Sequence, residues 1–128
     1  AQLIRLWQKE GCLQAAARMH PSYELSFDRI AEYIDKHYFE ELTVEKLAAM
    51  CGMSHSTFSL HFHRRYGMTC REYINATRIS VAENMLLFSD HDVAFIAQEV
   101  GYSDCSYFIR CYKKWKGITP KQARRAGK

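Results

Sequence analysis

Residues 101–120 read GYSDCSYFIRCYKKWKGITP and combine a turn, a helix start, an amphipathic helix and a second helix start. In a helix, residues at i, i+1, i+4, i+5 and i+8 share one face. That spacing predicts a core-facing set made of Tyr107, Phe108, Cys111, Tyr112 and Trp115. The remaining, outward-facing set contains Cys105, Ser106, Ile109, Arg110 and Lys113. What this outward face contacts is the functional question.

An internal repeat surrounds this stretch. VEKLAAMCGMS at 44–54 aligns with VAFIAQEVGYS at 93–103 at an offset of 49 residues, and beyond the turn the offset becomes 50. The matched pairs are Val44 and Val93, Leu47 and Ile96, Ala48 and Ala97, Gly52 and Gly101, Ser54 and Ser103, Phe58 and Phe108, Phe62 and Tyr112, Gly67 and Gly117, and Thr69 and Thr119. The chain therefore contains one structural unit twice.

Each copy has the spacing of a helix-turn-helix. A small residue (Ala48 or Ala97) lets two helices approach, and a glycine four residues later (Gly52 or Gly101) supplies the positive φ of a tight turn. One such pattern is weak evidence, because any helical hairpin can show it. Two copies with matched anchors predict two helix-turn-helix units.

The rest of the chain also shows helical periodicity, without sustained alternation of the kind that strands show. We predict an all-α fold of about seven helices, in which a long central helix joins two helix-turn-helix subdomains. The helix starts are Ser26 for a helix at 27–38, Thr43 for one ending at Met50, Ser54 for one ending at Tyr66, Thr69 with Glu72 as a capping box, Asp92, Ser103 or Asp104, and Thr119 with Pro120.

These signals predict the domain organisation. The first helix-turn-helix spans about 43–66, the connecting helix about 69–88 and the second helix-turn-helix about 92–116, within one module at 23–128. At about 20 residues, the connecting helix would be roughly 30 Å long. This length is close to one turn of DNA, the molecule that helix-turn-helix units bind in its major groove. Residues 1–22 are predicted to be the trailing segment of an upstream domain or a linker, with an extra helix of this fold as the alternative.

The connecting helix carries apolar residues that we expect to pack on both units. They are Ile74, Ala82, Met85 and Leu86. Arg78 lies between them and is either a buried salt-bridge partner or a phosphate contact. The sequence leaves both roles open.

Composition narrows the class of protein. The 128 residues are 48% hydrophobic and 13% aromatic, with apolar runs no longer than stretches such as MLLF at 85–88. These values predict a folded, cytoplasmic chain without a membrane span or export signal. The five cysteines contain no CxxC pair and are expected to be reduced thiols. The two histidines of HFH at 61–63 point to different sides of a helix, which does not suit a shared metal ion. We therefore expect no metal and no cofactor.

Charge is unevenly distributed although the net charge is only +4. Residues 24–45 hold seven acids against two bases, whereas residues 105–128 hold eight Lys or Arg and no acid. An anionic partner would select such a basic end, and a solvated basic tail gives the same count.

The second helix of a helix-turn-helix enters the major groove of DNA, so its exposed face is the candidate contact surface. Ser, Arg and exposed aliphatic side chains suit groove reading through hydroxyl hydrogen bonds, guanine O6/N7 and the thymine methyl. The first unit offers His55, Ser56, Ser59, Leu60, His63 and Arg64. The second offers Asp104, Cys105, Ser106, Ile109, Arg110, Lys113 and Lys114, and we expect the basic run Lys113, Lys114 and Lys116 to serve phosphates. The rival interpretation is that Leu60 and Ile109 pack on another protein.

Residues 101–120 are similar to the signature of the AraC/XylS-type transcription regulators, roughly G-F-S-x-x-S-Y-F-x-R-x-F-K-K-x-x-G-x-T-P. The positions that fit are Gly101, Ser103, Ser106, Tyr107, Phe108, Arg110, Lys113, Lys114, Gly117, Thr119 and Pro120. Tyr102 and Tyr112 replace the usual Phe. The resemblance covers about 26–125 and implies two helix-turn-helix units, joined by a long helix, that bind asymmetric DNA sites near promoters.

The resemblance also implies site residues and partners. Base-facing positions would be Ser56, Ser59 and Leu60 in the first unit and Cys105, Ser106, Ile109 and Arg110 in the second. The first unit departs from the family at Leu60, where many relatives have Arg, and at His61, where they have an aliphatic core residue. Most relatives carry an N-terminal effector or oligomerisation domain before this module.

Three functions compete on these observations. The leading hypothesis is sequence-specific binding of double-stranded DNA by a bacterial transcription regulator, and the alternative is a helical adaptor for a protein partner such as RNA polymerase. The third is an enzyme or thiol sensor at Cys105, near a helix N-terminus. No histidine or acid pair has catalytic spacing, so we expect no enzymatic activity.

Overall fold

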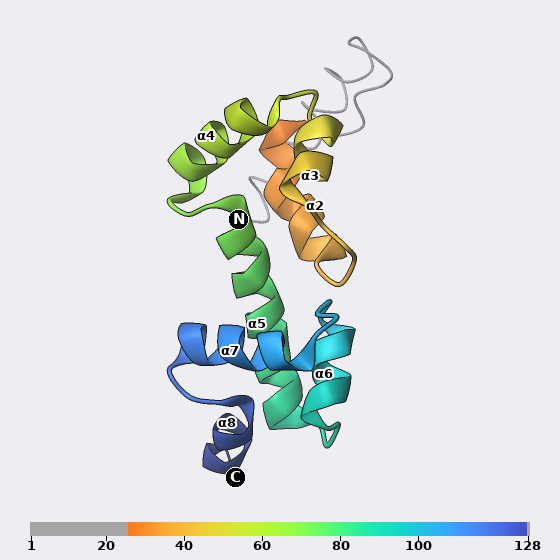
Figure 1. The fold of residues 1–128 in the computed structure, drawn as a ribbon, viewed down its shortest axis with the longest axis vertical. Helices are drawn as coiled ribbons and strands as arrows, with labels where there is room; N and C mark the ends of the chain where they lie inside the picture. Colours follow the sequence, from red (N-terminus) through yellow and green to blue (C-terminus); the bar gives the residue numbers. More distant parts are fainter. Residues whose placement is uncertain (1–25, 128) are drawn as a thin grey trace. The chain divides into compact units, whose positions relative to one another are not determined.

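The computed structural model describes residues 26–127, and this part of the chain is all-α without strands (Figure 1). The elements are a 3-10 turn η1 (Phe27–Arg29) and the helices α2 (Ile30–His37), α3 (Val44–Met50), α4 (His55–Tyr66), α5 (Cys70–Phe88), α6 (Val93–Glu99), α7 (Cys105–Lys116) and α8 (Pro120–Ala126). Seven α-helices confirm the predicted fold class. The predictions for residues 1–22 lie outside the described residues.

Side-chain caps start the helices where the sequence indicated. Side-chain oxygens of Thr43, Ser54, Asp92 and Thr119 accept from the backbone N–H three residues later, at 3.1, 3.2, 2.7 and 3.1 Å. Asp104, rather than Ser103, caps α7 and accepts from the backbone N–H of Ser106 and Tyr107 at 2.8 and 3.3 Å. Caps of this kind satisfy backbone donors that a helix start leaves without partners, and so they set where each helix begins.

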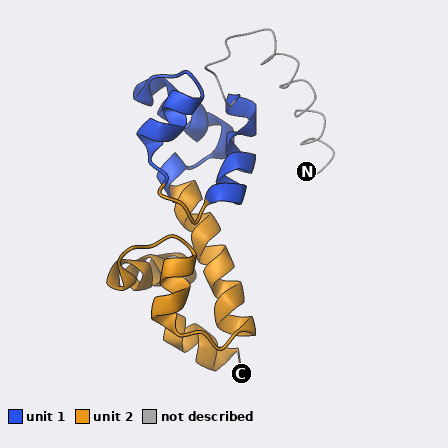
Figure 2. Cartoon of the chain, turned by 90° about the vertical axis from the view of Figure 1, so that its right-hand side faces the viewer, with its two compact units in different colours: residues 1–37, 42–71 blue, residues 38–41, 72–128 orange. Residues whose placement is uncertain are grey.

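The chain divides into two compact units, drawn in different colours in Figure 2. The described part of unit 1 is 26–37 and 42–71, and that of unit 2 is 38–41 and 72–127. Helix α5 begins in unit 1 and belongs to unit 2 from Glu72 onward. Unit 1 contains the first helix-turn-helix, α3 and α4, and unit 2 contains the second, α6 and α7.

Aromatic side chains of α4 build much of the core of unit 1. Phe58 and Phe62 are fully buried, with ring centroids 5.8 Å apart, and Phe27 meets Phe58 edge-on at 5.8 Å. The other buried residues of this unit are Ile30, Ile34, Leu47, Ala48 and Cys70. These contacts fix which side of α4 faces inward.

The core of unit 2 gathers side chains from four helices and the turn. Its buried residues are Ile79, Ala82 and Leu86 of α5, Ile96 and Ala97 of α6, Val100 and Tyr102 of the turn, Phe108, Cys111 and Tyr112 of α7, and Ala123 of α8. Arg124 of α8 adds a polar link, donating to the carbonyls of Leu86 and Ser89, both at 3.1 Å. The shared core and the two hydrogen bonds of Arg124 hold α6, α7 and α8 against α5.

Arg78 is not the salt-bridge partner that one of its two predicted roles required, because the described residues give it no ion pair. Its Nε and Nη2 donate to the backbone carbonyls of Tyr38 and Glu40 at 2.7 and 2.8 Å, and its guanidinium lies 5.3 Å from the ring centroid of Tyr102. All these residues belong to unit 2. Burial lowers the pKa of Arg78, while the carbonyl oxygens and the ring face offset the cost of burying its charge.

The first predicted helix, at 27–38, begins as a 3-10 turn and ends one residue earlier than expected. Ser26 caps the 3-10 turn by accepting from the N–H of Asp28 at 3.3 Å, and α2 then ends at His37. Tyr38, predicted as the last residue of this helix, lies beyond it, is partly buried and packs against the core of unit 2. Just past the end of α2, the Tyr38 carbonyl accepts a hydrogen bond from Arg78 at 2.7 Å.

None of the helices within residues 26–127 combines the length and the apolar character needed to cross a membrane.

Candidate nucleic-acid interface

The turn between the two helices has the same hydrogen bonds in both units. In unit 1 the N–H of Met53 donates to the Ala48 carbonyl at 2.9 Å, and in unit 2 Tyr102 donates to Ala97 at 2.9 Å. The turn glycines, Gly52 and Gly101, have φ of 69° and 107°. This confirms the predicted positive φ. The repeat is therefore one of backbone geometry as well as sequence.

The second helix of each unit also ends in the same way. Gly67 caps α4 with φ 73° and donates to the His63 carbonyl at 2.9 Å. Gly117 caps α7 with φ 82° and donates to Lys113 at 2.7 Å. A left-handed residue stops the helix and turns the chain, which glycine does without a steric penalty. Each unit thus presents a twelve-residue helix with defined ends.

The predicted face of α4 is open to solvent. Leu60 is 50% exposed, Ser59 is half-buried, and the other predicted residues are exposed, namely His55, Ser56, His63 and Arg64. The Nε2 of His55 lies 3.9 Å from the Glu45 carboxylate. His61 is exposed as well and touches Phe27 edge-on, with 6.1 Å between ring centroids. Arg64 is the one lysine or arginine among the residues of this predicted face.

The predicted face of α7 is exposed and basic. Asp104, Ser106, Arg110, Lys113 and Lys114 are exposed, and Ile109 is 36% exposed. Cys105 departs from the prediction, because it is half-buried and packs against the core of unit 2. Asp104 has a structural role as the cap of α7. The face that remains combines one aliphatic side chain, one hydroxyl and three cations.

Two residues predicted to face the core lie at its edges. Tyr107 is 41% exposed and Trp115 is 40% exposed, whereas Phe108, Cys111 and Tyr112 are buried. Each helical residue turns the side chain by about 100°, so Tyr107 lies well away from the centre of the buried stripe. Trp115 is in the last turn of the helix. The buried stripe is narrower than the sequence pattern suggested.

Tyr107 supports Arg110, a contact that the sequence reading missed. The Arg110 guanidinium lies 5.7 Å from the centroid of the Tyr107 ring, one helical turn away. A ring face beneath a guanidinium attracts the charge and restricts the side chain. The sequence signal for this contact was an aromatic residue followed three positions later by an arginine, because side chains at i and i+3 are neighbours on a helix.

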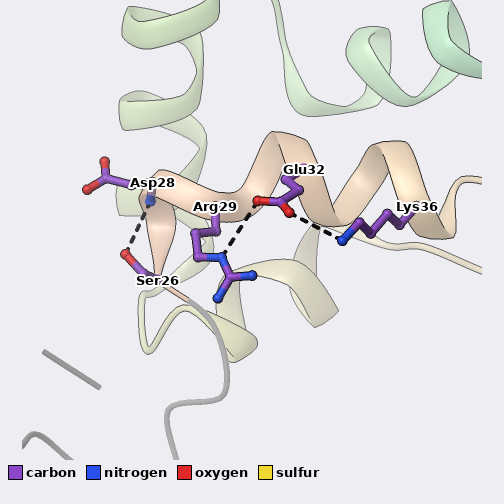
Figure 3. A network of polar contacts seen from close by, with 5 residues as sticks. All are labelled: Ser26, Asp28, Arg29, Glu32 and Lys36. Atoms are coloured by element: carbon purple, nitrogen blue, oxygen red, sulfur yellow. Dashed lines mark hydrogen bonds and ion pairs between the residues drawn. The ribbon is translucent and has the colours of Figure 1, made fainter. Parts of the chain in front are cut away.

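Several cations are already engaged within the fold. Arg65 pairs with Asp28, and Lys116, which we expected to serve phosphates, pairs with Glu83 at 3.1 Å. On α2, Glu32 holds both Arg29 at 3.7 Å and Lys36 at 3.3 Å, as Figure 3 shows. By contrast, the described residues hold no ion-pair partner for the cations of the two exposed faces, which are Arg64, Arg110, Lys113 and Lys114.

Metal binding and thiol reactivity depend on how the cysteines and histidines of the described residues are placed. Residues 26–127 contain no cluster of His, Cys, Asp and Glu able to hold a metal ion. Burial raises the pKa of Cys51 to about 11 and that of Cys70 to about 12. These two thiols are therefore protonated and unreactive at neutral pH.

The chain matches known proteins over most of the described region. Residues 47–126 match a protein-family model described as a helix-turn-helix domain. The bifunctional transcriptional activator/DNA repair enzyme AdaA of Bacillus subtilis is 38% identical over 105 residues, which cover 79% of this chain and 48% of AdaA. The chain spans about half or less of the length of the curated relatives it matches first.

Solved structures agree in fold. The DNA-binding domain of AdpA, a global transcriptional factor crystallised with a target DNA, superposes with a TM-score of 0.75 at 25% identity, covering 78% of this chain and 90% of that one. A probable AraC family transcriptional regulator from Rhodopseudomonas palustris gives a TM-score of 0.70 at 25% identity, covering 80% and 96%.

Proposed function

The chain belongs to the AraC-type family of helix-turn-helix transcription regulators, and from this membership we propose that it binds double-stranded DNA sequence-specifically. In this proposal α4 and α7 each enter a major-groove segment, and the two segments follow one another along the duplex. The observation that carries the proposal is the duplicated turn, with the same hydrogen bonds at Met53 and Tyr102 and an exposed helix after each.

The second unit reads bases mainly through Arg110. An arginine can donate two hydrogen bonds to guanine O6 and N7, a contact worth about 1–3 kcal/mol of discrimination. The Tyr107 ring below the guanidinium supports this role by limiting its freedom before binding. Ile109 offers apolar contact to a thymine methyl, and the Ser106 hydroxyl offers a hydrogen bond. Cys105 borders this surface from its half-buried position.

The first unit reads bases through neutral groups. Ser56 and Ser59 carry hydroxyls, and Leu60 offers only apolar contact, to which a thymine methyl is the natural complement. His55 and His63 flank this set near the two ends of α4. The two units therefore prefer different bases, so the target is asymmetric and one copy of the chain is enough to read it.

Cations beside the reading faces contact phosphates. Arg64, Lys113 and Lys114 are exposed and project from the later turns of the two helices. Phosphate contacts fix the register of a protein on the duplex without reading its sequence. They also make affinity fall steeply with salt, because each neutralised phosphate releases counterions.

Binding a protein in place of DNA is not favoured, since the exposed aliphatic residues Leu60 and Ile109 stand among hydroxyls and cations rather than in an apolar patch. We also propose RNA polymerase as a second partner. An effector or oligomerisation domain is proposed to precede this DNA-binding module in the full-length protein. The similarity to AdaA involves a helix-turn-helix region, so we propose no repair chemistry here. The proposed place of action is the cytoplasm, where bacterial DNA lies.

The test is selection of duplexes from a random pool by the 128-residue chain, followed by footprinting and titration in salt. We expect one asymmetric consensus, protection of two successive major-groove segments by a monomer, and a steep loss of affinity as salt rises. A pool without enrichment, a single protected segment, or a palindrome that requires a dimer would contradict the proposal.

A further inference from the structure

The repeat continues past the reading helices into the helix that follows each of them. At the same offset of 50 residues, Arg71 in the first turn of α5 corresponds to Lys121 in the first turn of α8. Neither belongs to the exposed faces of α4 and α7. A basic residue thus occurs at the same place in both units.

The local structure at the two positions is also the same. Each follows its helix-ending glycine, Gly67 or Gly117, by four residues. The residue just before each cation is buried, Cys70 in one unit and Pro120 in the other. Burial of that neighbour fixes the register of the first turn, and Arg71 and Lys121 are therefore both turned to solvent, where the structure shows them exposed.

Neither cation has a part in holding its unit together. Other basic residues of the same units do, through Arg65 with Asp28, Lys116 with Glu83 and Arg124 with two carbonyls. For Arg71 and Lys121 the described residues provide no ion pair, hydrogen bond or ring contact. A long cationic side chain without a structural partner is free to bind an external anion.

We propose that Arg71 and Lys121 are a matched pair of DNA phosphate contacts, one for each unit. The inference rests on the proposed function: when α4 or α7 lies in a major groove, the chain leaving its end passes the phosphates at the groove edge. Arg71 then extends the cationic row begun by Arg64, and Lys121 extends the row begun by Lys114, which is the repeat counterpart of Arg64.

Because both contacts are to phosphate, they add affinity without adding base preference. The experiment compares Arg71→Gln, Lys121→Gln and the double variant with the unchanged 128-residue chain. The probes are the duplex selected above and an unrelated duplex of equal length. Lys36→Gln is the matched control, because it removes the same charge from α2, where Glu32 already pairs with it.

We expect each single substitution to lower the slope of log affinity against log salt by about one, and the double substitution by about two. The decrease should be equal on both duplexes, so the ratio of their affinities stays unchanged. Arg71→Lys should keep the original slope, and Lys36→Gln should leave it unchanged. Helicity and thermal unfolding of each variant exclude loss of fold as the cause.

An unchanged slope in Arg71→Gln and Lys121→Gln, or a loss confined to the selected duplex, would overturn the inference. Failure of the proposed function has a different signature, because the unchanged chain would then bind neither duplex in a salt-dependent way. A full loss with Arg71→Lys would also count against a phosphate contact, since lysine retains the charge.

Discussion

The helix-turn-helix motifs of units 1 and 2 have the same turn geometry and different exposed chemistry. The turn hydrogen bonds, the positive-φ glycines and the aromatic anchors match. On α4 and α7, however, Leu60 stands where the second unit has Arg110, and exposed His61 stands where it has buried Cys111. A handful of positions maintain the turn, and the remaining surface positions are free to differ. Two different exposed surfaces can thus be built on one repeated turn.

The units also differ in how polar groups stabilise them. In unit 2, Arg78 and Arg124 together hold four backbone carbonyls, and Lys116 pairs with Glu83. In unit 1 the corresponding link between helices is the pair of Arg65 and Asp28, whose side chains are 35% and 52% exposed. Exposed pairs such as Arg65 with Asp28 and Lys116 with Glu83 contribute little to stability, whereas partly buried carbonyls that lose their donors are more costly. Substitutions that disturb these polar links should therefore lower the stability of unit 2 more than that of unit 1.

The largest effect is expected from Gly101→Ala in the turn of unit 2. A Cβ there would lie 2.9 Å from Arg78 Nε and 2.9 Å from the Tyr38 carbonyl oxygen, and φ is already +107°. We expect a loss of about 3 kcal/mol or more in the free energy of unfolding, measured by urea denaturation. Gly117→Ala is the control, because φ is +82° there but nothing lies within 4 Å, so only about 1–2 kcal/mol should be lost. Equal losses would contradict the role of the Arg78 contact.

The next effect separates the two reading helices. Arg110→Ala should remove about 1–3 kcal/mol of discrimination at one base of the second segment, whereas Leu60→Ala should cost less and mainly weaken a thymine preference in the first. Affinities for single-base variants of the selected duplex measure both. If Arg110→Ala weakened every duplex equally while Leu60→Ala abolished specificity, the assignment of reading roles to the two units would be wrong.

A smaller effect distinguishes two neighbouring lysines of α7. Lys114→Gln should lower the salt slope of DNA binding by about one, because the exposed cation is available to a phosphate. Lys116→Gln should change the slope less, since Glu83 already neutralises Lys116. Repeating Lys116→Gln in a Glu83→Gln background tests this reason directly. There the lysine is released, and its removal should then have the larger effect.

The smallest effect is expected from deletion of residues 1–22. The repeat and its caps begin later, at Thr43 and Ser54, so DNA affinity should stay nearly unchanged. Affinity and circular dichroism of the two chains are compared directly. A large loss of both affinity and helicity in the shorter chain would assign this segment to the fold of the module.

Much of the fold could be predicted because its signals are local. A Ser, Thr or Asp before an amphipathic stretch marks a helix start, and the caps at Thr43, Ser54, Asp92 and Thr119 follow that rule. The duplicated Ala and Gly spacing located both turns. The sequence also identified most of the exposed residues on α4 and α7, since a helix with two fixed anchors has only one outward face.

The missed features depend on residues far apart in the chain. Arg78 binds carbonyls about 40 positions away, and Lys116 finds Glu83 on another helix, so neither partner is visible in the local pattern. Tyr107 was misplaced because an aromatic residue at the edge of a stripe satisfies the same spacing as one at its centre, and Trp115 because it lies in the last turn of α7, where the core ends. Whether a cation is free to bind DNA also depends on the side chains that pack around it. The spacing of residues in the sequence does not reveal those neighbours.

The contact between Arg78 and the Tyr38 and Glu40 carbonyls bears on how the chain can be dissected. Residues 38–41 precede the whole first helix-turn-helix in the sequence and yet belong to unit 2. A fragment beginning at residue 72 would leave the partly buried Arg78 guanidinium without its two acceptors. The two halves of the repeat are therefore not interchangeable cassettes: excising the second half, or grafting it onto another protein, requires the short peptide 38–41 to be supplied with it.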